Sequence, residues 1–374
     1  MNPPIRKVLV VQPFGIGDSL FVTPLLRTLK ASAKVERLDM MVGSRTKEVF
    51  ERNPAVDRIF VIDRDRLRKQ SPFKNFFELS RLILDLRKTR YDLLIDCSLS
   101  REYGFYAKFF AGIPERIGFN YKQRGVFLTR KVELPGGFDR EPVAEYYTAL
   151  LKQIGINVTD RRSDFFLKRE DLDRAKSVLE SAGIGTGGNY AVAVPGGGDS
   201  WGRDAHFKQW SPFGFAQVMN GISRRFPLEA LVILGTAREF ETGSKVAAVY
   251  GGKSVNFCGK LSLIESAAVL KGALFLLAND SGLVHIARAM EIPCIAFYGP
   301  VNEKVYGAYP RGPAYLSIAR DDLDCRPCYQ SFRYDSSCLH RACLTELSPV
   351  RVIDEILKSG FFEILKERKA PSVD

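Results

Sequence analysis

A short polar segment at 279–285 carries the residue types best suited to bind a phosphate group. Asp280, Ser281, Gly282 and His285 follow the apolar run 273–278 and precede a helical stretch. A buried strand, a tight turn and a helix start point backbone N–H groups and the positive end of the helix dipole at one spot. Asp280 and His285 flank that spot with groups that reach hydroxyls and phosphate oxygens. The alternative is an ordinary N-capped helix after a core strand, with Ser281 or Asp280 as the cap.

A second candidate site follows the first apolar run of the chain. Gly15, Gly17 and Asp18 stand between this run and a helical segment. The spacing matches a dinucleotide fingerprint only in part, because Leu20 stands where that motif has its third glycine. We expect the two glycines to let a ligand approach the backbone and Asp18 to project an ionised carboxylate, which the helix dipole favours. A plain N-cap role for Asp18 stays open.

These segments lie in a chain that alternates short apolar runs with helical periodicity. Parallel sheets covered by helices on both faces have this rhythm, so we predict an α/β fold. Two series are expected, with strands at 7–12, 38–42, 58–62 and 92–96, then at 190–194, 228–234, 273–278 and 294–298. The predicted helices are at 19–32, 76–88, 102–111 and 143–154, then at 213–225, 239–249 and 264–271.

The length of 374 residues exceeds what one hydrophobic core usually organises, so we predict two domains. We place an N-terminal Rossmann-like domain at 1–165 and a C-terminal one at 166–348. A helical segment at 349–374 would pack back across the domain junction. Because open α/β folds bind ligands beyond the carboxyl ends of their strands, the two domains are expected to face each other across a central cleft.

Composition restricts the class of protein. With 45% hydrophobic and 26% charged residues the chain is typical of a globular enzyme. The first residues have neither the apolar core nor the cleavage site of a secretory signal, and no apolar stretch is long enough to cross a bilayer. Seven cysteines, an odd number, fit reduced thiols better than a disulfide framework. We therefore expect a cytoplasmic protein.

The net charge of +12 is concentrated in the first half of the chain. Residues 1–160 have 28 lysines and arginines against 19 aspartates and glutamates. A basic surface suits nucleic acid, an anionic membrane or an acidic substrate, and simple solubility is the alternative. No nucleic-acid-binding motif is recognisable. We therefore predict no nucleic-acid partner. Peripheral association with the inner face of the cytoplasmic membrane is the preferred explanation of the basic surface.

An ordered set of motifs across nearly the whole chain resembles glycosyltransferase family 9, which contains the lipopolysaccharide heptosyltransferases. Each motif is weak singly, but their order is specific. The motifs are Gly-Ile-Gly-Asp at 15–18, Thr-Pro-Leu-Leu at 23–26, Lys-Gln-Trp-Ser-Pro at 208–212, Asp-Ser-Gly-Leu-Val-His at 280–285 and Phe-Tyr-Gly-Pro at 297–300. Segment 111–119 also resembles a family segment.

The resemblance implies a GT-B fold of two Rossmann-like domains, with an N-terminal acceptor domain and a C-terminal nucleotide-sugar domain. It implies inverting transfer without a metal, with ADP-heptose as the expected donor and an anionic glycolipid of the lipopolysaccharide inner-core type as the acceptor. Asp18 would be the general base and Lys208 would bind the donor diphosphate. The sugar and phosphate site would be lined by Asp280, Ser281, Gly282 and His285.

Three further assignments keep open alternatives. Glu239 is our choice for holding the ribose hydroxyls, with Glu241 as a close competitor. The alternative to diphosphate binding for Lys208 is a surface lysine beside Trp210, which would pack in the core. Arg101 could meet phosphates of the acceptor, and an exposed arginine at a helix start is the alternative.

Four cysteines lie within nineteen residues near the end of the chain, at Cys325, Cys328, Cys338 and Cys343. Their leading C-x2-C pair is compatible with a structural zinc site, although the spacing is not that of a named finger. Reduced thiols that pack a loop are the alternative. We expect no cofactor to be required for catalysis.

These observations predict a glycosyltransferase that moves a heptose or related sugar to a lipopolysaccharide-type acceptor. Inversion needs an acceptor oxygen on one face of the anomeric carbon and the leaving diphosphate on the other, so the base and the phosphate ligands should come from different domains. Two alternatives remain: a nucleotide-sugar epimerase or hydrolase on the same fold, and a non-catalytic nucleotide- or glycan-binding protein.

Overall fold

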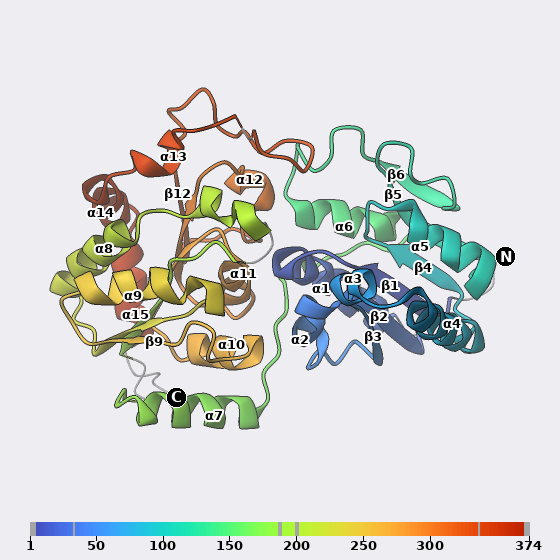
Figure 1. The fold of residues 1–374 in the computed structure, drawn as a ribbon, viewed down its shortest axis with the longest axis horizontal. Helices are drawn as coiled ribbons and strands as arrows, with labels where there is room; N and C mark the ends of the chain where they lie inside the picture. The colour runs from blue at the N-terminus through green and yellow to red at the C-terminus, as the bar shows by residue number, and fades with distance from the viewer. Residues whose placement is uncertain (1–4, 33, 186–188, 199–201, 336, 370–374) are drawn as a thin grey trace. The chain divides into compact units, whose positions relative to one another are not determined.

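The computed structural model describes residues 5–32, 34–185, 189–198, 202–335 and 337–369 (Figure 1). The chain divides into two compact units, residues 1–166 and 167–374. Each unit contains a six-stranded sheet, and all neighbouring strands in both sheets run parallel. The prediction of an α/β protein with parallel sheets is confirmed.

The sheet of the first unit has the strand order β3-β2-β1-β4-β5-β6. Its strands are β1 (Lys7–Gln12), β2 (Arg37–Gly43), β3 (Arg58–Ile62), β4 (Leu93–Asp96), β5 (Glu115–Asn120) and β6 (Arg130–Glu133). The helices are α1 (Ile16–Ala31), η1 (Ser44–Thr46), α2 (Lys47–Phe50), α3 (Arg64–Lys69), α4 (Pro72–Thr89), α5 (Arg101–Tyr106), η2 (Ala107–Ala111) and α6 (Val143–Lys152).

The sheet of the second unit has the order β12-β11-β10-β7-β8-β9. Its strands are β7 (Tyr190–Val194), β8 (Ala230–Ile233), β9 (Ser254–Asn256), β10 (Leu276–Asn279), β11 (Cys294–Tyr298) and β12 (Tyr315–Ala319). The helices are α7 (Arg169–Ser181), η3 (Gly202–Lys208), α8 (Pro212–Arg225), η4 (Ala237–Glu239), α9 (Phe240–Val249), α10 (Leu263–Lys271), α11 (Gly282–Ala289), α12 (Glu303–Tyr306), α13 (Ala342–Thr345), α14 (Pro349–Lys358) and α15 (Phe361–Lys369).

Both sheets reverse the direction in which strands are added at a central position. In the first unit this switch lies between β1 and β4, and in the second between β7 and β10. The loops that leave the two strands at such a point diverge to opposite faces of the sheet, which leaves a crevice at the carboxyl edge where ligands bind. The predicted site residues should therefore be sought beyond the ends of these four strands.

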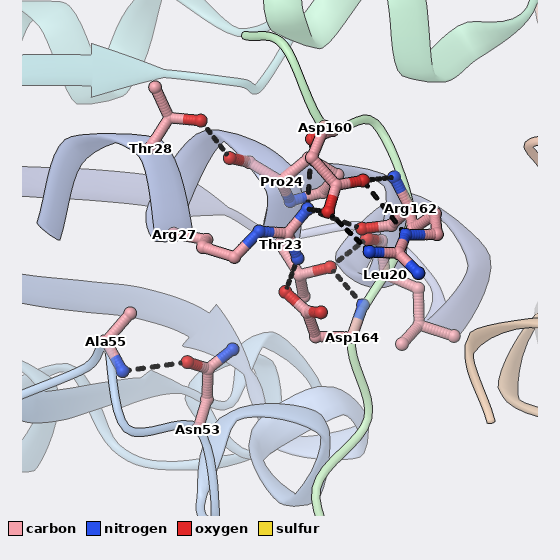
Figure 2. A network of polar contacts seen from close by, with 10 residues as sticks. All are labelled: Leu20, Thr23, Pro24, Arg27, Thr28, Asn53, Ala55, Asp160, Arg162 and Asp164. Carbon is pink, nitrogen blue, oxygen red and sulfur yellow. Dashed lines mark hydrogen bonds and ion pairs between the residues drawn. The ribbon is translucent and has the colours of Figure 1, made fainter. Parts of the chain in front are cut away.

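Helix α1 contains the Thr-Pro motif at 23–24, and the structure gives it a physical reason (Figure 2). Pro24 lies inside the helix and has no N–H, so the carbonyl of Leu20 loses its usual partner. The Thr23 hydroxyl donates to that carbonyl at 2.7 Å and accepts a hydrogen bond from the backbone N–H of Asp164 at 2.8 Å. The Thr23 hydroxyl thus replaces the hydrogen bond that Pro24 removes, and it connects α1 to the segment that ends the first unit.

Arg27, one turn further along α1, strengthens the same attachment. Its guanidinium donates to the carbonyls of Asp160 and Arg162 at 2.9 and 3.0 Å and forms an ion pair with Asp164, as Figure 2 shows. Hydrogen bonds and an ion pair from the single helix α1 therefore hold the end of the first unit.

The C-terminal helices belong to the core of the second unit. Val352 and Ile356 of α14 and Phe361 and Leu365 of α15 are buried in the same apolar cluster as Phe275, which directly precedes β10. The end of the segment predicted at 349–374 lies outside the described residues, because these stop at residue 369.

Several elements were missed by periodicity. Strands β5, β6, β9 and β12 were not predicted. Strands β6 and β9 are short and polar and lie at sheet edges, so their apolar pattern is weak. Helix α7 was also missed, since it has few apolar residues. Among the described residues, no helix combines the length and the apolar character needed to cross a membrane.

Candidate functional site

The centre of the site in the second unit is a buried ion pair beyond β10. Lys208 Nζ, at the end of η3, lies 2.7 Å from Asp280 Oδ2. The two side chains are only 9% and 8% exposed. Burying a lysine costs too much free energy to be incidental unless it is paired or used, so the interpretation of Lys208 as a surface lysine is wrong.

Asn279, the last residue of β10, organises the loops around this pair. Its Nδ2 donates to the carbonyl of Pro195 at 2.7 Å, and its Oδ1 accepts from the backbone N–H of Trp210 at 3.1 Å. One amide therefore joins the loop after β7 to the segment that carries Lys208. Trp210 packs against Phe297 of β11, which fixes that segment on the core.

Ser281 occupies the N-cap position of α11, but its hydroxyl does not cap the helix. None of the described residues lies within hydrogen-bonding distance of this buried oxygen. A buried hydroxyl without a partner is costly, and the first N–H groups of a helix have no partner within it. The turn at Ser281 and Gly282 is thus able to donate to an anion.

His285 lies in the first turn of α11, 7% exposed. Burial is the main cause that lowers the pKa of its imidazole to about 4; the charge of Asp280 acts in the opposite direction, and the nearby Lys208 adds to the lowering. The ring is therefore neutral at physiological pH. A neutral imidazole offers one N–H and one acceptor nitrogen, which suits a sugar hydroxyl better than a phosphate.

Glu239 is held by backbone N–H groups beyond β7 and β8. Its Oε1 accepts from Gly198 at 2.8 Å and its Oε2 accepts from Thr236 at 2.7 Å. The carboxylate is 6% exposed and retains acceptor capacity for hydroxyl groups. Its competitor Glu241 is 82% exposed and pairs with Lys245, so the structure places Glu241 at the surface.

The glycine loop after β7 lies between Glu239 and Lys208. A Cβ on Gly196 would come within 1.9 Å of Glu239 Oε1, and one on Gly197 would contact the Ala205 carbonyl at 2.5 Å and Lys208 Cβ at 3.4 Å. Side chains at these two positions would therefore displace the loop. Residues 199–201 at its end lie outside the described residues. Because the loop contacts both, it brings Glu239 and the Lys208–Asp280 pair to the same edge of the sheet.

In the first unit, Asp18 lies in the first turn of α1, directly beyond β1. The hydroxyl of Tyr147, from α6, donates to Asp18 Oδ1 at 3.1 Å. The N-cap of α1 is Gly15, whose φ of −72° does not require glycine. Asp18 is therefore not the cap, and a close ligand approach at Gly15 and Gly17 stays a prediction.

Two buried ionisable residues, Asp96 and Cys97, lie at the end of β4, and Cys97 is close enough to Asp18 for their charges to interact. Burial raises the pKa of Asp96 to about 7, while hydrogen bonds from Ser98 act in the opposite direction. Burial also raises the pKa of the Cys97 thiol well above its ordinary value, and the charges of Asp96 and Asp18 add to this. Arg101, the first residue of α5, is exposed.

The four clustered cysteines differ in exposure: Cys325 is exposed, Cys328 and Cys338 are half-buried and Cys343 is buried. Burial raises the pKa of Cys343 to about 11. Within the described ranges, no three His, Cys, Asp or Glu side chains are arranged to hold a metal ion. The structure therefore adds no support for the zinc alternative, which stays a prediction.

Comparison with known proteins assigns the family. The family model of glycosyltransferase family 9 (heptosyltransferase) matches residues 79–333. The chain belongs to glycosyltransferase family 9. The predicted resemblance is thereby confirmed, and the protein is a glycosyltransferase.

Relatives of this family 9 enzyme extend over nearly its whole length. The lipopolysaccharide heptosyltransferase 1 of Pseudomonas aeruginosa is 26% identical, with 94% of this chain and 97% of the relative covered. A family 9 glycosyltransferase from Veillonella parvula has a TM-score of 0.77 at 20% identity, covering 98% of this chain and 99% of the other. The E. coli heptosyltransferase WaaC, solved with ADP, has a TM-score of 0.70 at 21% identity, covering 94% and 99%. The prediction of a GT-B fold is confirmed.

Sequence reasoning missed one part of this candidate site, the contact of Tyr147 with Asp18. Tyr147 lies in an amphipathic helix, where the pattern predicts that a tyrosine is an ordinary core residue. The residues next to it in the sequence did not indicate a contact with Asp18. Gly196 and Gly197 carried a signal, because adjacent glycines after a predicted strand often mark a close approach of backbone to ligand.

Proposed function

We propose that this family 9 enzyme is an inverting heptosyltransferase that moves a heptose from ADP-heptose to an acceptor of the lipopolysaccharide inner-core type, with Asp18 as the general base. The observation that carries the proposal is the buried Lys208–Asp280 pair beside the start of α11, 2.7 Å between Nζ and Oδ2. It lies at the point of the sheet where open α/β folds bind nucleotides.

The second unit binds the donor. Lys208 and the N–H groups at Ser281 and Gly282 hold the diphosphate, because they supply positive charge and donors at one spot. Glu239 holds the ribose hydroxyls, and the neutral His285 and Asp280 hydrogen-bond to the sugar. The choice of ADP follows the relative WaaC, whose structure contains ADP, and the choice of heptose follows the names of the curated relatives.

The first unit binds the acceptor and supplies the base. The acceptor oxygen forms a bond to the anomeric carbon while the bond to the diphosphate oxygen breaks, and Asp18 takes the hydroxyl proton. A carboxylate is a weak base towards an alcohol, so the proton moves late, when the attacking oxygen has become acidic. Tyr147 holds the carboxylate in place. Gly15 and Gly17 admit the acceptor, and Arg101 meets its phosphates.

The leaving diphosphate develops negative charge, which Lys208 and the helix start stabilise. Catalysis by these groups alone needs no divalent metal. A structural zinc at the four cysteines would have no part in this step, and metal analysis of the purified protein tests whether it is there. Work on a lipid-anchored acceptor would take place at the inner face of the cytoplasmic membrane.

The test is a panel of nucleotide sugars assayed for nucleotide release that depends on acceptor. ADP-heptose should give release only when a heptose-accepting glycolipid is present, and Asp18→Asn should bind the donor but not turn over. Release without acceptor would indicate a hydrolase or epimerase instead. Binding without any turnover, in protein shown to be folded, would indicate a non-catalytic binding protein.

A further inference from the structure

Helix α5 and its continuation η2 bury their small residues and, apart from the half-buried Tyr103, expose their aromatic ones. Gly104, Ala107 and Ala111 face the core, where Ala107 and Ala111 join the apolar cluster that contains Leu86 of α4 and Leu9 of β1. An amphipathic helix normally turns its largest apolar side chains inward. This helix does the opposite.

The exposed side of the helix carries four aromatic side chains at adjacent helical positions. Phe105, Tyr106, Phe109 and Phe110 are 36%, 45%, 55% and 42% exposed. Their spacing of i, i+1, i+4 and i+5 places them on one face, opposite the buried small residues. The ring centroids of Phe105 and Phe109 lie 5.0 Å apart, and those of Tyr106 and Phe110 lie 5.8 Å apart. The rings form one continuous apolar surface.

The loop at 121–128 extends this surface. Phe127 packs its ring against Phe105 and Phe109, with centroids 5.3 and 5.8 Å away, and a Cβ on Gly104 would contact Phe127 at 3.3 Å. Val126, next to it, is 65% exposed. We call these six residues the aromatic face: Phe105, Tyr106, Phe109, Phe110, Val126 and Phe127.

Cationic side chains border the aromatic face. Lys108 Nζ lies 5.0 Å from the centroid of the Phe109 ring. Lys122 and Arg124 lie on the same loop as Phe127, and all three cations are exposed. Arg124 Nη1 donates to the Leu99 carbonyl at 3.4 Å, which ties the loop to the start of the helix.

We propose that the aromatic face is a docking surface for an anionic phospholipid bilayer, in which the rings enter the headgroup region and the bordering cations meet lipid phosphates. Aromatic side chains with lysines and arginines around them are the composition of membrane-interface segments. An anionic leaflet attracts such a cationic border. A contiguous apolar surface of this kind on a globular protein marks an interaction site.

A second copy of the chain fits this surface less well. A two-fold contact would bring the same patch of each copy together, so the cationic borders of the two copies would face each other. A bilayer offers the opposite charge. The proposal rests on the proposed function in one respect: a lipid-anchored acceptor explains why the unit with Asp18 would dock on a membrane.

The experiment is co-sedimentation of the full-length protein with vesicles of phosphatidylcholine alone, or with about a third of the lipid replaced by phosphatidylglycerol. The wild type should bind the anionic vesicles, and less at high salt. The double variant Phe109→Ser/Phe110→Ser should lower the partition coefficient about tenfold or more. Lys108→Glu should lower it several-fold through charge alone. The matched control is Phe213→Ser in the second unit, because Phe213 is also 55% exposed and should bind like the wild type.

Absence of binding to anionic vesicles, or equal binding by wild type and double variant, overturns the proposal. So does a wild-type dimer that the double variant converts to monomer while neither binds vesicles, because the aromatic face would then join two copies. Transfer to a water-soluble acceptor fragment, measured in parallel, separates the two hypotheses. If the double variant keeps this activity but loses vesicle binding, both hold; if transfer persists and vesicles are never bound, only the docking surface falls.

Discussion

Lys208 Nζ and Asp280 Oδ2 lie 2.7 Å apart, and both side chains are almost completely buried. The pair joins the loop before α8 to the turn before α11, so it sets the position of the cation relative to the helix start. A buried pair costs more to break than it contributes when intact, since the remaining charge has no compensation. Under the proposed function, donor binding and stability are therefore coupled at this point of the fold.

Replacing Lys208 alone should destabilise the protein more than replacing the whole pair. Lys208→Met leaves the Asp280 carboxylate buried alone and should lower the free energy of unfolding by about 3–5 kcal/mol. Lys208→Met/Asp280→Asn should recover much of this loss in urea denaturation, whereas donor binding should stay weak in both variants. Equal destabilisation by the single and double variants would contradict the pairing.

Asp18 and Tyr147 should separate chemistry from positioning. Asp18→Asn should lower turnover by about 10²–10⁴ because general base catalysis is lost. Tyr147→Phe removes one hydrogen bond to the carboxylate, at 3.1 Å, and should lower turnover less. The loss of that donor makes the carboxylate easier to protonate, so the acid limb of the pH–rate profile should move to higher pH. An unchanged profile in Tyr147→Phe would show that the tyrosine has no influence on the base.

His285 should stay neutral down to acidic pH. Burial lowers its pKa to about 4 in the folded protein, whereas the ordinary value is 6.5. The unfolded chain therefore takes up a proton first, and stability that is fully present above pH 6.5 is lost as the pH falls towards 4, by about 3 kcal/mol at most. His285→Asn should lose this dependence, and NMR titration of the imidazole should find no protonation above pH 5.

Asp96 should have the opposite pH dependence. Its pKa is raised by burial to about 7 from the ordinary 3.8, so the folded protein keeps a proton that the unfolded chain releases. Stability should therefore fall as the pH rises from 4 to 7, by about 4 kcal/mol at most. Asp96→Asn should raise the melting temperature at pH 8 more than at pH 5. A constant difference across this range would show that Asp96 is ionised throughout.

Gly196→Ala should impair donor binding through Glu239. The added Cβ would lie 1.9 Å from Glu239 Oε1, and hydrogen bonds from Gly198 and Thr236 leave this carboxylate no easy alternative position. We expect the donor KM to rise about tenfold, which corresponds to the loss of one or two hydrogen bonds between Glu239 and the donor. The control is Gly251→Ala in the same unit, whose Cβ would make an ordinary contact of 3.5 Å with Asn220. Similar kinetics for the two variants would remove Glu239 from the donor site.

Much of this architecture could be predicted because the relevant information is local. Runs of valine, leucine and isoleucine such as 7–12 are buried on both faces of a parallel sheet and mark themselves as strands. Asp18 and the 280–285 segment could be named because their motifs adjoin such runs, whereas Lys208 could be named only because its motif resembles one of the family. Edge strands such as β6 were missed because their burial, and so their pattern, is incomplete.

The amino-acid sequence by itself indicated the family, the order of the central strands and of most of the longer helices, and the residue types available for chemistry. Only the tertiary structure decided that Lys208 pairs with Asp280, that Tyr147 reaches Asp18, and that the aromatic rings of α5 face outward. The physical reason is that periodicity shows which residues share a helix face, whereas the side on which that face lies depends on what packs against it. In α5 and η2 the core takes up Gly104, Ala107 and Ala111 and part of Tyr103, whereas the other four rings are left outside.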